Sequence, residues 1–278
     1  MTMFEMDLWM SMAYFIEQQV DYCIIEAGMG GRLDATTALD YKACLITNVG
    51  LDHTEYLGDT FEQIAYEKSG VFKPNVPALT TEDKPECQKV MELVADYMKT
   101  PLCFIDCQET DVLRWNGMTF HLNPPLYQAK NLSLALETLN VLGIWLEENE
   151  IQQVIDHFQW AGRYMVLRKD PLVLLDGAHN VHGITALIQS LKDFTGKIYF
   201  SVLKEKDAPH MIQLLQSISK DITLVEISSA RLYPLEELGY PIITVDELVS
   251  RLLDTKEDSL LCGSLYYVGE VLEKWGNV

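Results

Sequence analysis

The chain has 278 residues, of which 48% are hydrophobic and 22% charged, a composition typical of a globular protein with one or two domains. Its 41 acidic residues outnumber its 21 basic residues, which gives a formal net charge of −20. This excess of acids argues against binding to the phosphate backbone of nucleic acid, which depends on basic patches, but it leaves small anionic ligands open.

The first half of the chain shows helices and strands in alternation. The predicted elements are a helix over 4–19, strands over 21–28 and 42–50, a helix over 59–70, a strand over 76–80, a helix over 84–98 and a strand over 101–106. Asp59 is the predicted N-cap of its helix and Gly70 the predicted stop. Asn116 and Gly117 predict a type I′ turn within a hairpin over 112–122.

The second half begins with a long helix predicted over 128–147 and a shorter one before residue 160. Five predicted strands then alternate with helices, over 171–176, 197–203, 221–228, 241–245 and 259–264. This alternation predicts a parallel sheet with right-handed crossovers. We therefore predict two α/β domains, residues 1–160 and 161–278.

The ends of the chain and its cysteines indicate a cellular location. The first residues carry acids where a secretory signal would carry bases, and no apolar run is long enough to span a bilayer. Six cysteines are scattered, and no second Cys or His pair completes a zinc site with Cys103 and Cys107. We expect a cytoplasmic protein with reduced thiols that binds neither nucleic acid nor a membrane.

Three polar residues follow predicted strands closely: Glu26, His53 and Asp176. Ligands of open parallel sheets gather at the carboxyl ends of strands, so these residues are candidates for a site. The alternative is that polar residues collect at strand ends without any chemistry. Each of the three lies beside a glycine or a tight loop, and this favours a site.

Lys68 lies on the apolar side of its predicted helix, because Phe61, Ile64 and Lys68 are spaced three and four residues apart. Its long side chain could run along the core with the amine in water. The amine could instead be buried beside other site groups with a lowered pKa, as in reactive lysines. The spacing leaves both interpretations open.

The segment "EAGMGGRLDATT", residues 26–37, places three glycines in four residues after an apolar run. Glycine-rich turns after strands often hold phosphate, but no G-x-x-x-x-G-K-[ST] sequence occurs in the chain. The turn lacks the lysine that would reach the terminal phosphates, so it is not a P-loop.

Five segments together carry a family resemblance: "EAGMGGRLDATT", "ITNVGLDHTEYLGDT", "IAYEKSG", "GRY" followed by "LLDGAHNVHG", and "CGSLYYVGEV". They resemble, in order, the folylpolyglutamate synthase/dihydrofolate synthase branch of the Mur ligases. The resemblance implies that residues 1–160 are the remainder of the central ATP-binding domain without its P-loop. Residues 161–278 would then be the Rossmann-like C-terminal domain, with a mainly parallel sheet.

The resemblance implies a metal and a modified lysine. Glu26 and His53 match the magnesium ligands of the family, so we expect them to approach each other at one end of the first sheet. Lys68 matches the family lysine that carries a carbamate, and we expect its amine to be buried and directed toward them. These three residues are the implied catalytic residues.

The remaining implied roles concern the substrates. Pterin contacts are implied for Leu33, Asp34 and Ala35, and ATP contacts for Asn131, Arg163, Asp176 and the neighbouring His179. The implied reaction is ATP-dependent ligation of L-glutamate to dihydropteroate or a reduced folate through an acyl phosphate, with Mg²⁺. Members of the family are usually monomeric.

The chain departs from the family pattern in one respect. The family places its P-loop, and a serine that completes the magnesium shell, upstream of the Glu26 block, and neither occurs here. We therefore expect an N-terminally truncated form that is inactive in ligation by itself and poorly soluble, with residues 164–278 best ordered. The alternative is a non-catalytic remnant or binding module derived from such a ligase.

Overall fold

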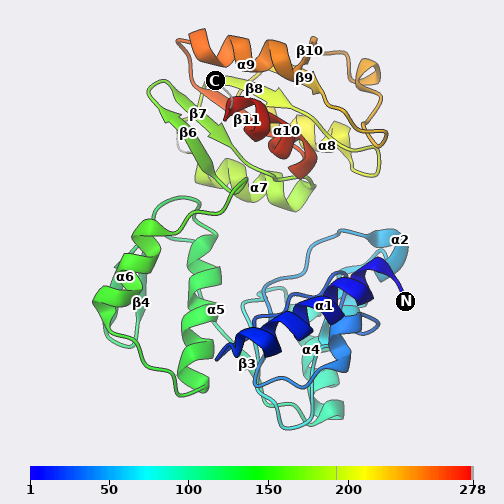
Figure 1. Cartoon of the computed structure of the whole chain (residues 1–278), viewed down its shortest axis with the longest axis vertical. Coiled ribbons are helices and arrows are strands. Elements are labelled where there is room, and N and C mark those ends of the chain that lie inside the picture. Colours follow the sequence, from blue (N-terminus) through cyan, green and yellow to red (C-terminus); the bar gives the residue numbers. More distant parts are fainter. Residues whose placement is uncertain (192, 277–278) are drawn as a thin grey trace. The chain divides into compact units, whose positions relative to one another are not determined.

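The computed structural model describes residues 1–191 and 193–276, which form two compact units. Unit 1 consists of residues 1–109, 114–118 and 129–147, and unit 2 of residues 110–113, 119–128 and 148–278. Figure 1 shows that both units mix helices and strands. The mixed α/β class is therefore as predicted, whereas the domain boundary near residue 160 stays a prediction.

Unit 1 is organised around a short parallel sheet in the order β1 (Cys44–Ile46), β2 (Ala78–Thr80) and β3 (Leu102–Phe104). Helices α3 (Phe61–Ser69) and α4 (Pro85–Met98) supply much of its core. The fully buried side chains of this core include Ile64, Phe72, Cys87 and Met91. The alternation of apolar residues along the sequence had predicted all five elements.

The predicted first strand, 21–28, is wrong. Its residues have no regular structure, and Ile24 is 94% exposed. A strand exists only when its backbone groups pair with a neighbouring strand, and the described sheet contains β1, β2 and β3 without this segment. The preceding helix α1 (Met3–Gln18) is as predicted and begins with a capping box of Thr2 and Glu5, but it buries no residue.

The ends of two helices differ from their predicted positions. Helix α3 is capped by Thr60, one residue after Asp59, because Thr60 forms a capping box with Gln63. Gly70 ends this helix as predicted. Helix α5 (Gln128–Val141) stops before the predicted residue 147, and Gly143 follows it with a φ of +72°.

Smaller elements complete the description of the chain. A hairpin joins β4 (Val112–Trp115) to β5 (Met118–His121), and Asn116 and Gly117 both have positive φ, as a type I′ turn requires. The other short elements are η1 (Ala35–Ala38), α2 (Thr54–Leu57), α6 (Glu148–His157) and η2 (Leu235–Leu238). None of the helices in the described ranges is long and apolar enough to cross a membrane.

Unit 2 contains a six-stranded sheet in the order β10-β9-β8-β11-β7-β6. Its strands are β6 (Met165–Lys169), β7 (Leu172–Leu175), β8 (Lys197–Phe200), β9 (Ile222–Glu226), β10 (Ile242–Thr244) and β11 (Ser259–Cys262). All neighbours are parallel except β6, which runs antiparallel to β7 at the edge. The parallel strands confirm the prediction, whereas β6 had no counterpart in it.

Helices cover both faces of this sheet. Helices α7 (Val181–Ser190) and α8 (Ala208–Leu215) contribute to one buried cluster, and α9 (Val245–Asp254) and α10 (Leu265–Trp275) to the other. Along β7, Leu174 belongs to the first cluster, and Val173 and Leu175 belong to the second. Successive side chains of a strand point to opposite faces, so a continuous apolar run serves a sheet that is buried on both sides.

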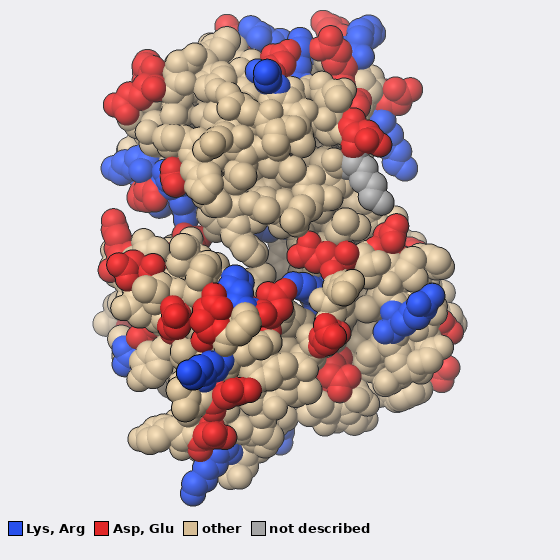
Figure 2. Space-filling view, turned by 180° about the vertical axis from the view of Figure 1, so that it is seen from behind, with Lys and Arg blue, Asp and Glu red and all other residues tan. Residues whose placement is uncertain are grey.

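Charge is distributed over both units. On the face shown in Figure 2, acidic side chains occur across the surface, and Lys and Arg lie among them instead of forming a continuous basic patch. This distribution accords with the net charge of −20.

Candidate functional site

The glycine-rich turn is fastened to the end of α3, the helix that carries Lys68. The backbone N–H of Arg32 donates to the carbonyl of Glu67 at 2.8 Å. A Cβ at Gly31 would lie 2.8 Å from the Lys68 carbonyl oxygen, and a Cβ at Gly70 would lie 2.2 Å from Arg32 Cα. The two backbones approach this closely because both positions are glycine.

Side chains add a second connection between the turn and the helix. The Arg32 guanidinium donates from Nε (3.0 Å) and Nη2 (2.9 Å) to one carboxylate oxygen of Glu67. The Arg32 side chain is 42% exposed and the Glu67 side chain 17% exposed, so water screens this pair and weakens it. The backbone contact is therefore the main fastening.

Asp34 uses its carboxylate inside the turn. It accepts hydrogen bonds from the N–H of Thr36 (2.9 Å), the hydroxyl of Thr36 (2.6 Å) and the N–H of Met29 (3.0 Å). Burial opposes its ionisation, but these donors outweigh burial and lower the pKa of the carboxyl. Of its predicted partners in pterin binding, Leu33 is 81% exposed and Ala35 is half-buried. The pterin contact stays a prediction for all three.

Lys68 is partly buried in the last turn of α3. Burial lowers the pKa of its ammonium, whereas the nearby carboxylates of Asp52 and Glu26 act in the opposite direction. Glu26, an exposed residue, is thus within electrostatic range of the lysine, as the resemblance implies. Asp52 was not singled out from the sequence, although it directly precedes His53.

His53 is exposed and occupies the N-cap position of α2 with a φ of +52°. Its backbone N–H donates to the carboxylate of Asp52 at 2.9 Å. His53 thus directly follows Asp52, whose charge acts on Lys68 together with that of Glu26. Whether His53 and Glu26 share a metal stays a prediction.

The donors around Lys68 fit a hydrated Mg²⁺. This ion keeps several waters and takes one or two protein carboxylates, and Glu26 and Asp52 offer such oxygens. The described residues contain no group of three or more His, Cys, Asp or Glu side chains that could hold a metal. Any metal here would thus depend on water and substrate oxygens for the rest of its coordination.

Unit 2 places Asp176 directly after β7, at the carboxyl end of the sheet. The side chain is 3% exposed and accepts from the N–H of Tyr164 and the N–H of Ala178, each at 2.7 Å. Burial raises the pKa of Asp176, and these bonds and the charges of Arg163 and His179 act against the increase. Asp176 therefore joins the segment before β6 to the loop after β7.

Two other predicted ATP contacts lie around Asp176 in the same unit. A Cβ at Gly177 would lie 2.5 Å from Arg163 Nη1, so the guanidinium rests against this glycine. The ring Nδ1 of His179 lies 2.9 Å from the Gly177 carbonyl oxygen. Tyr127, which the sequence did not single out, belongs to the same group, because burial together with Asp176 raises its pKa to about 12.

Asn131, the last predicted ATP contact, is exposed on α5 in unit 1. The predicted ATP residues are therefore divided between the units, and only Arg163, Asp176 and His179 are brought together within one unit.

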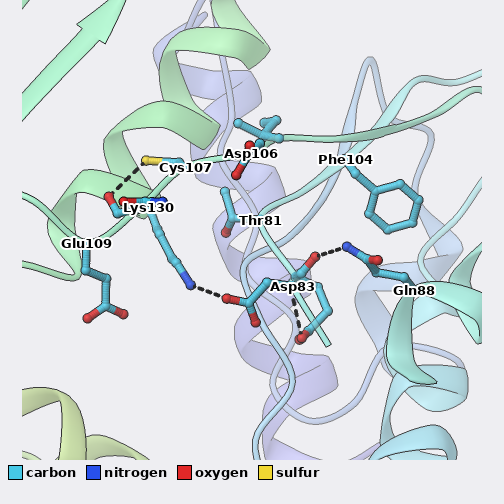
Figure 3. A pocket seen from close by; sticks show the side chains of 11 residues that line it. Thr81, Asp83, Gln88, Phe104, Asp106, Cys107, Glu109 and Lys130 are labelled. Atoms are coloured by element: carbon cyan, nitrogen blue, oxygen red, sulfur yellow. Dashed lines mark hydrogen bonds and ion pairs between the residues drawn. The ribbon is translucent and has the colours of Figure 1, made fainter. Parts of the chain in front are cut away.

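Unit 1 also contains a cavity of about 560 Å³ at the carboxyl ends of β2 and β3. Its lining comprises Thr81, Glu82, Asp83, Gln88, Lys130 and residues 104–109. Figure 3 shows Lys130 extending from α5 toward Asp83, and the ammonium lies 2.7 Å from that carboxylate. None of the predicted site residues lines this cavity, so it is separate from the group around Lys68.

Comparison with known proteins gives these sites a context. Residues 2–122 match the Mur ligase middle domain. The dihydrofolate synthase/folylpolyglutamate synthase of Bacillus subtilis is 29% identical over 310 residues, which cover 98% of this chain and 72% of that protein.

Solved structures extend the similarity to the fold. Escherichia coli FolC in complex with ADP is 28% identical, with a TM-score of 0.87 over 100% of this chain and 72% of that chain. The Yersinia pestis bifunctional folylpolyglutamate synthase/dihydrofolate synthase, complexed with AMPPNP and a Mn ion, is 25% identical, with a TM-score of 0.87. The match covers 99% of this chain and 72% of that chain. The chain is thus similar over nearly its whole length to folylpolyglutamate and dihydrofolate synthases, and its residues 2–122 match the Mur ligase middle domain.

Proposed function

We propose that the site serves an ATP-dependent ligase that adds L-glutamate to dihydropteroate, to a reduced folate or to both, through an acyl phosphate. The observation that carries this proposal is the similarity over 98% or more of the chain to enzymes of this name. The charges of Asp52 and Glu26, which act on the pKa of Lys68, support it. Solved relatives contain ADP, or AMPPNP with Mn, which supports ATP and a divalent metal as partners.

In this proposal the residues around Lys68 prepare the phosphoryl transfer. Glu26 and His53 hold Mg²⁺, which when bound would neutralise the charge on the phosphate oxygens. The Lys68 amine, whose pKa burial lowers, is the nucleophile toward CO₂. The new N–C bond gives a carbamate and releases one proton, and the resulting anion adds a negative charge beside the metal site.

The other residues position the substrates. Leu33 and Ala35, with the turn that Asp34 holds together, form one edge of the pterin site. The residues that contact the nucleoside in this proposal are Arg163, Asp176, His179 and Asn131. Positioning of the carboxylate, the phosphate and the glutamate amine then supplies much of the rate.

The absence of a G-x-x-x-x-G-K-[ST] sequence from residues 1–278 favours a second candidate, a non-catalytic binding module. Backbone N–H groups of such a loop supply most triphosphate contacts, and adenine and ribose contacts alone give weak binding.

The test compares two proteins, residues 1–278 and the same residues preceded by a strand–P-loop–helix segment. Each receives ATP, Mg²⁺, L-glutamate and dihydropteroate or a reduced folate, and amide formation is followed by mass spectrometry. We expect product from the extended protein alone. In its Lys68→Ala variant we expect the rate of amide formation to fall at least about 100-fold, because positioning of the metal site is lost. Pterin binding without product in either protein would favour the binding module, and an active Lys68→Ala variant would refute the carbamate.

A further inference from the structure

Glu82 is a carboxylate buried just after β2, with only 2% of its surface exposed. A buried charge must be paired or hydrogen-bonded, and Glu82 satisfies this requirement with four donors. Its Oε1 accepts from the N–H of Asp83 (3.1 Å), the N–H of Lys84 (2.8 Å) and the Lys84 ammonium (3.1 Å). Its Oε2 accepts from the N–H of Val49.

The bond to Val49 crosses from one strand-end loop to the next. Val49 lies three residues after β1 and is fully buried, in the segment 47–53 that ends in Asp52 and His53. Thr81, the residue before Glu82, donates its hydroxyl to the carbonyl of Thr47 at 2.7 Å. Two consecutive side chains after β2 therefore hold the segment after β1 at two points.

The far end of this segment leads into α2. His53 is exposed with a positive φ, and α2 beyond it is a single turn of four residues. Residues 47–49 connect β1 to Asp52 and His53, so the point at which they are fixed contributes to the direction in which Asp52 and His53 leave the sheet.

We propose that Glu82 is a positioning residue, which fixes the segment 47–53 and thereby orients Asp52 and His53. The inference rests on the proposed function in one respect, namely that His53 takes part in metal binding. Residues that orient metal ligands from behind affect affinity about 10- to 100-fold, so a measurable consequence follows.

The variant Glu82→Gln keeps an acceptor on the Oε1 side of the group and removes the acceptor on the Oε2 side. An amide has one acceptor oxygen, and the three donors on the Oε1 side, one of them an ammonium, attract that oxygen. The NH₂ group is then turned toward the N–H of Val49, which loses its acceptor. Asp83→Asn is the matched control, because the carboxylate of this neighbouring acid pairs with Lys130 in the cavity.

The first measurement is amide hydrogen exchange by NMR on the whole chain. We expect the Val49 amide to exchange at least about tenfold faster in Glu82→Gln than in wild type, and within about twofold of wild type in Asp83→Asn. Unchanged Val49 exchange in a folded Glu82→Gln protein would overturn the proposal, as would equal effects of the two variants. If Glu82→Gln does not fold, Thr81→Val, which removes the bond to Thr47, must accelerate exchange in 47–53 for the proposal to stand.

The second measurement is Mn²⁺ binding, followed by electron paramagnetic resonance. We expect Glu82→Gln to weaken Mn²⁺ binding by about tenfold, and Asp83→Asn to leave it unchanged. If His53→Ala does not alter Mn²⁺ binding, the metal role of His53 is refuted. The amide exchange of Val49 then decides whether Glu82 fixes the segment 47–53. Binding that His53→Ala abolishes and Glu82→Gln leaves intact would overturn the positioning role alone.

Discussion

Replacing Gly70 by alanine tests whether the glycine turn and α3 are fastened by backbone contact. Gly70 has φ −62° and ψ −9°, a conformation that alanine adopts without strain. At such a position alanine usually stabilises a protein by about 0.4–1 kcal/mol, because it restricts the unfolded chain. The added methyl would here meet Arg32, with Cα at 2.2 Å, Cβ at 2.3 Å and N at 2.6 Å.

These distances determine the expected sign. Two of the three atoms belong to the Arg32 backbone, so no side-chain rotation relieves the clash, and the turn must move away from the helix. Overpacking of this kind costs about 1–3 kcal/mol. Movement of the turn also endangers the bond from Arg32 N–H to the Glu67 carbonyl, which contributes about 1 kcal/mol. After subtraction of the gain from the restricted unfolded chain, we expect Gly70→Ala to lower the free energy of unfolding by about 1–3.5 kcal/mol.

The assay is urea unfolding of the whole chain, followed by far-UV circular dichroism. Gly269→Ala is the control, because Gly269 lies inside α10 and a Cβ there meets no atom within 4 Å. This control should stabilise unit 2 by about 0.5–1 kcal/mol, as expected for Gly to Ala in a helix. A Gly70→Ala protein as stable as wild type would show that the turn and α3 are not in contact at this position.

Three further predictions concern individual ionisable groups. Asp176→Asn should lower the free energy of unfolding of unit 2 by about 1–3 kcal/mol, because an amide can accept from only one of the two buried N–H donors; an unchanged unfolding midpoint would contradict this. The exposed Cys23 should react readily with a thiol reagent at pH 8, whereas burial raises the pKa of Cys87 to about 12 and should leave it unmodified in the folded chain; mass spectrometry of peptides would detect the opposite order. The folded pKa of Asp34 lies below its ordinary value of 3.8, so its stabilising contribution is present above pH 3.8 and is lost as the pH falls through the folded pKa; an NMR titration that gave Asp34 a pKa above 3.8 would refute the assignment of its hydrogen bonds.

The fold of unit 2 and most of unit 1 follows from local sequence patterns. Continuous apolar runs such as 172–175 indicated strands buried on both faces, and Gly70 and the Asn116–Gly117 pair indicated where elements end. The segment 21–28 had the same apolar character and forms no strand, because pairing with a neighbour is not encoded within the segment itself. The edge strand β6 was not predicted, because its residues are only partly buried and show no clear apolar run. Pairing with β7 makes them a strand.

The sequence by itself indicated the family resemblance, most of the helices and strands, and the chemically capable residues, because motifs and periodicity are properties of neighbouring positions. It left open whether Lys68 is solvated or lies among carboxylates, since helical spacing defines a face of the helix and not what covers that face. The tertiary structure adds that Lys68 is partly buried, that burial lowers the pKa of its amine, and that the carboxylates of Asp52 and Glu26 act in the opposite direction. It also revealed the burial and the donors of Glu82, which has no motif of its own. A buried carboxylate is recognised only by its donors, and one of these, the N–H of Val49, lies 33 residues away in the chain.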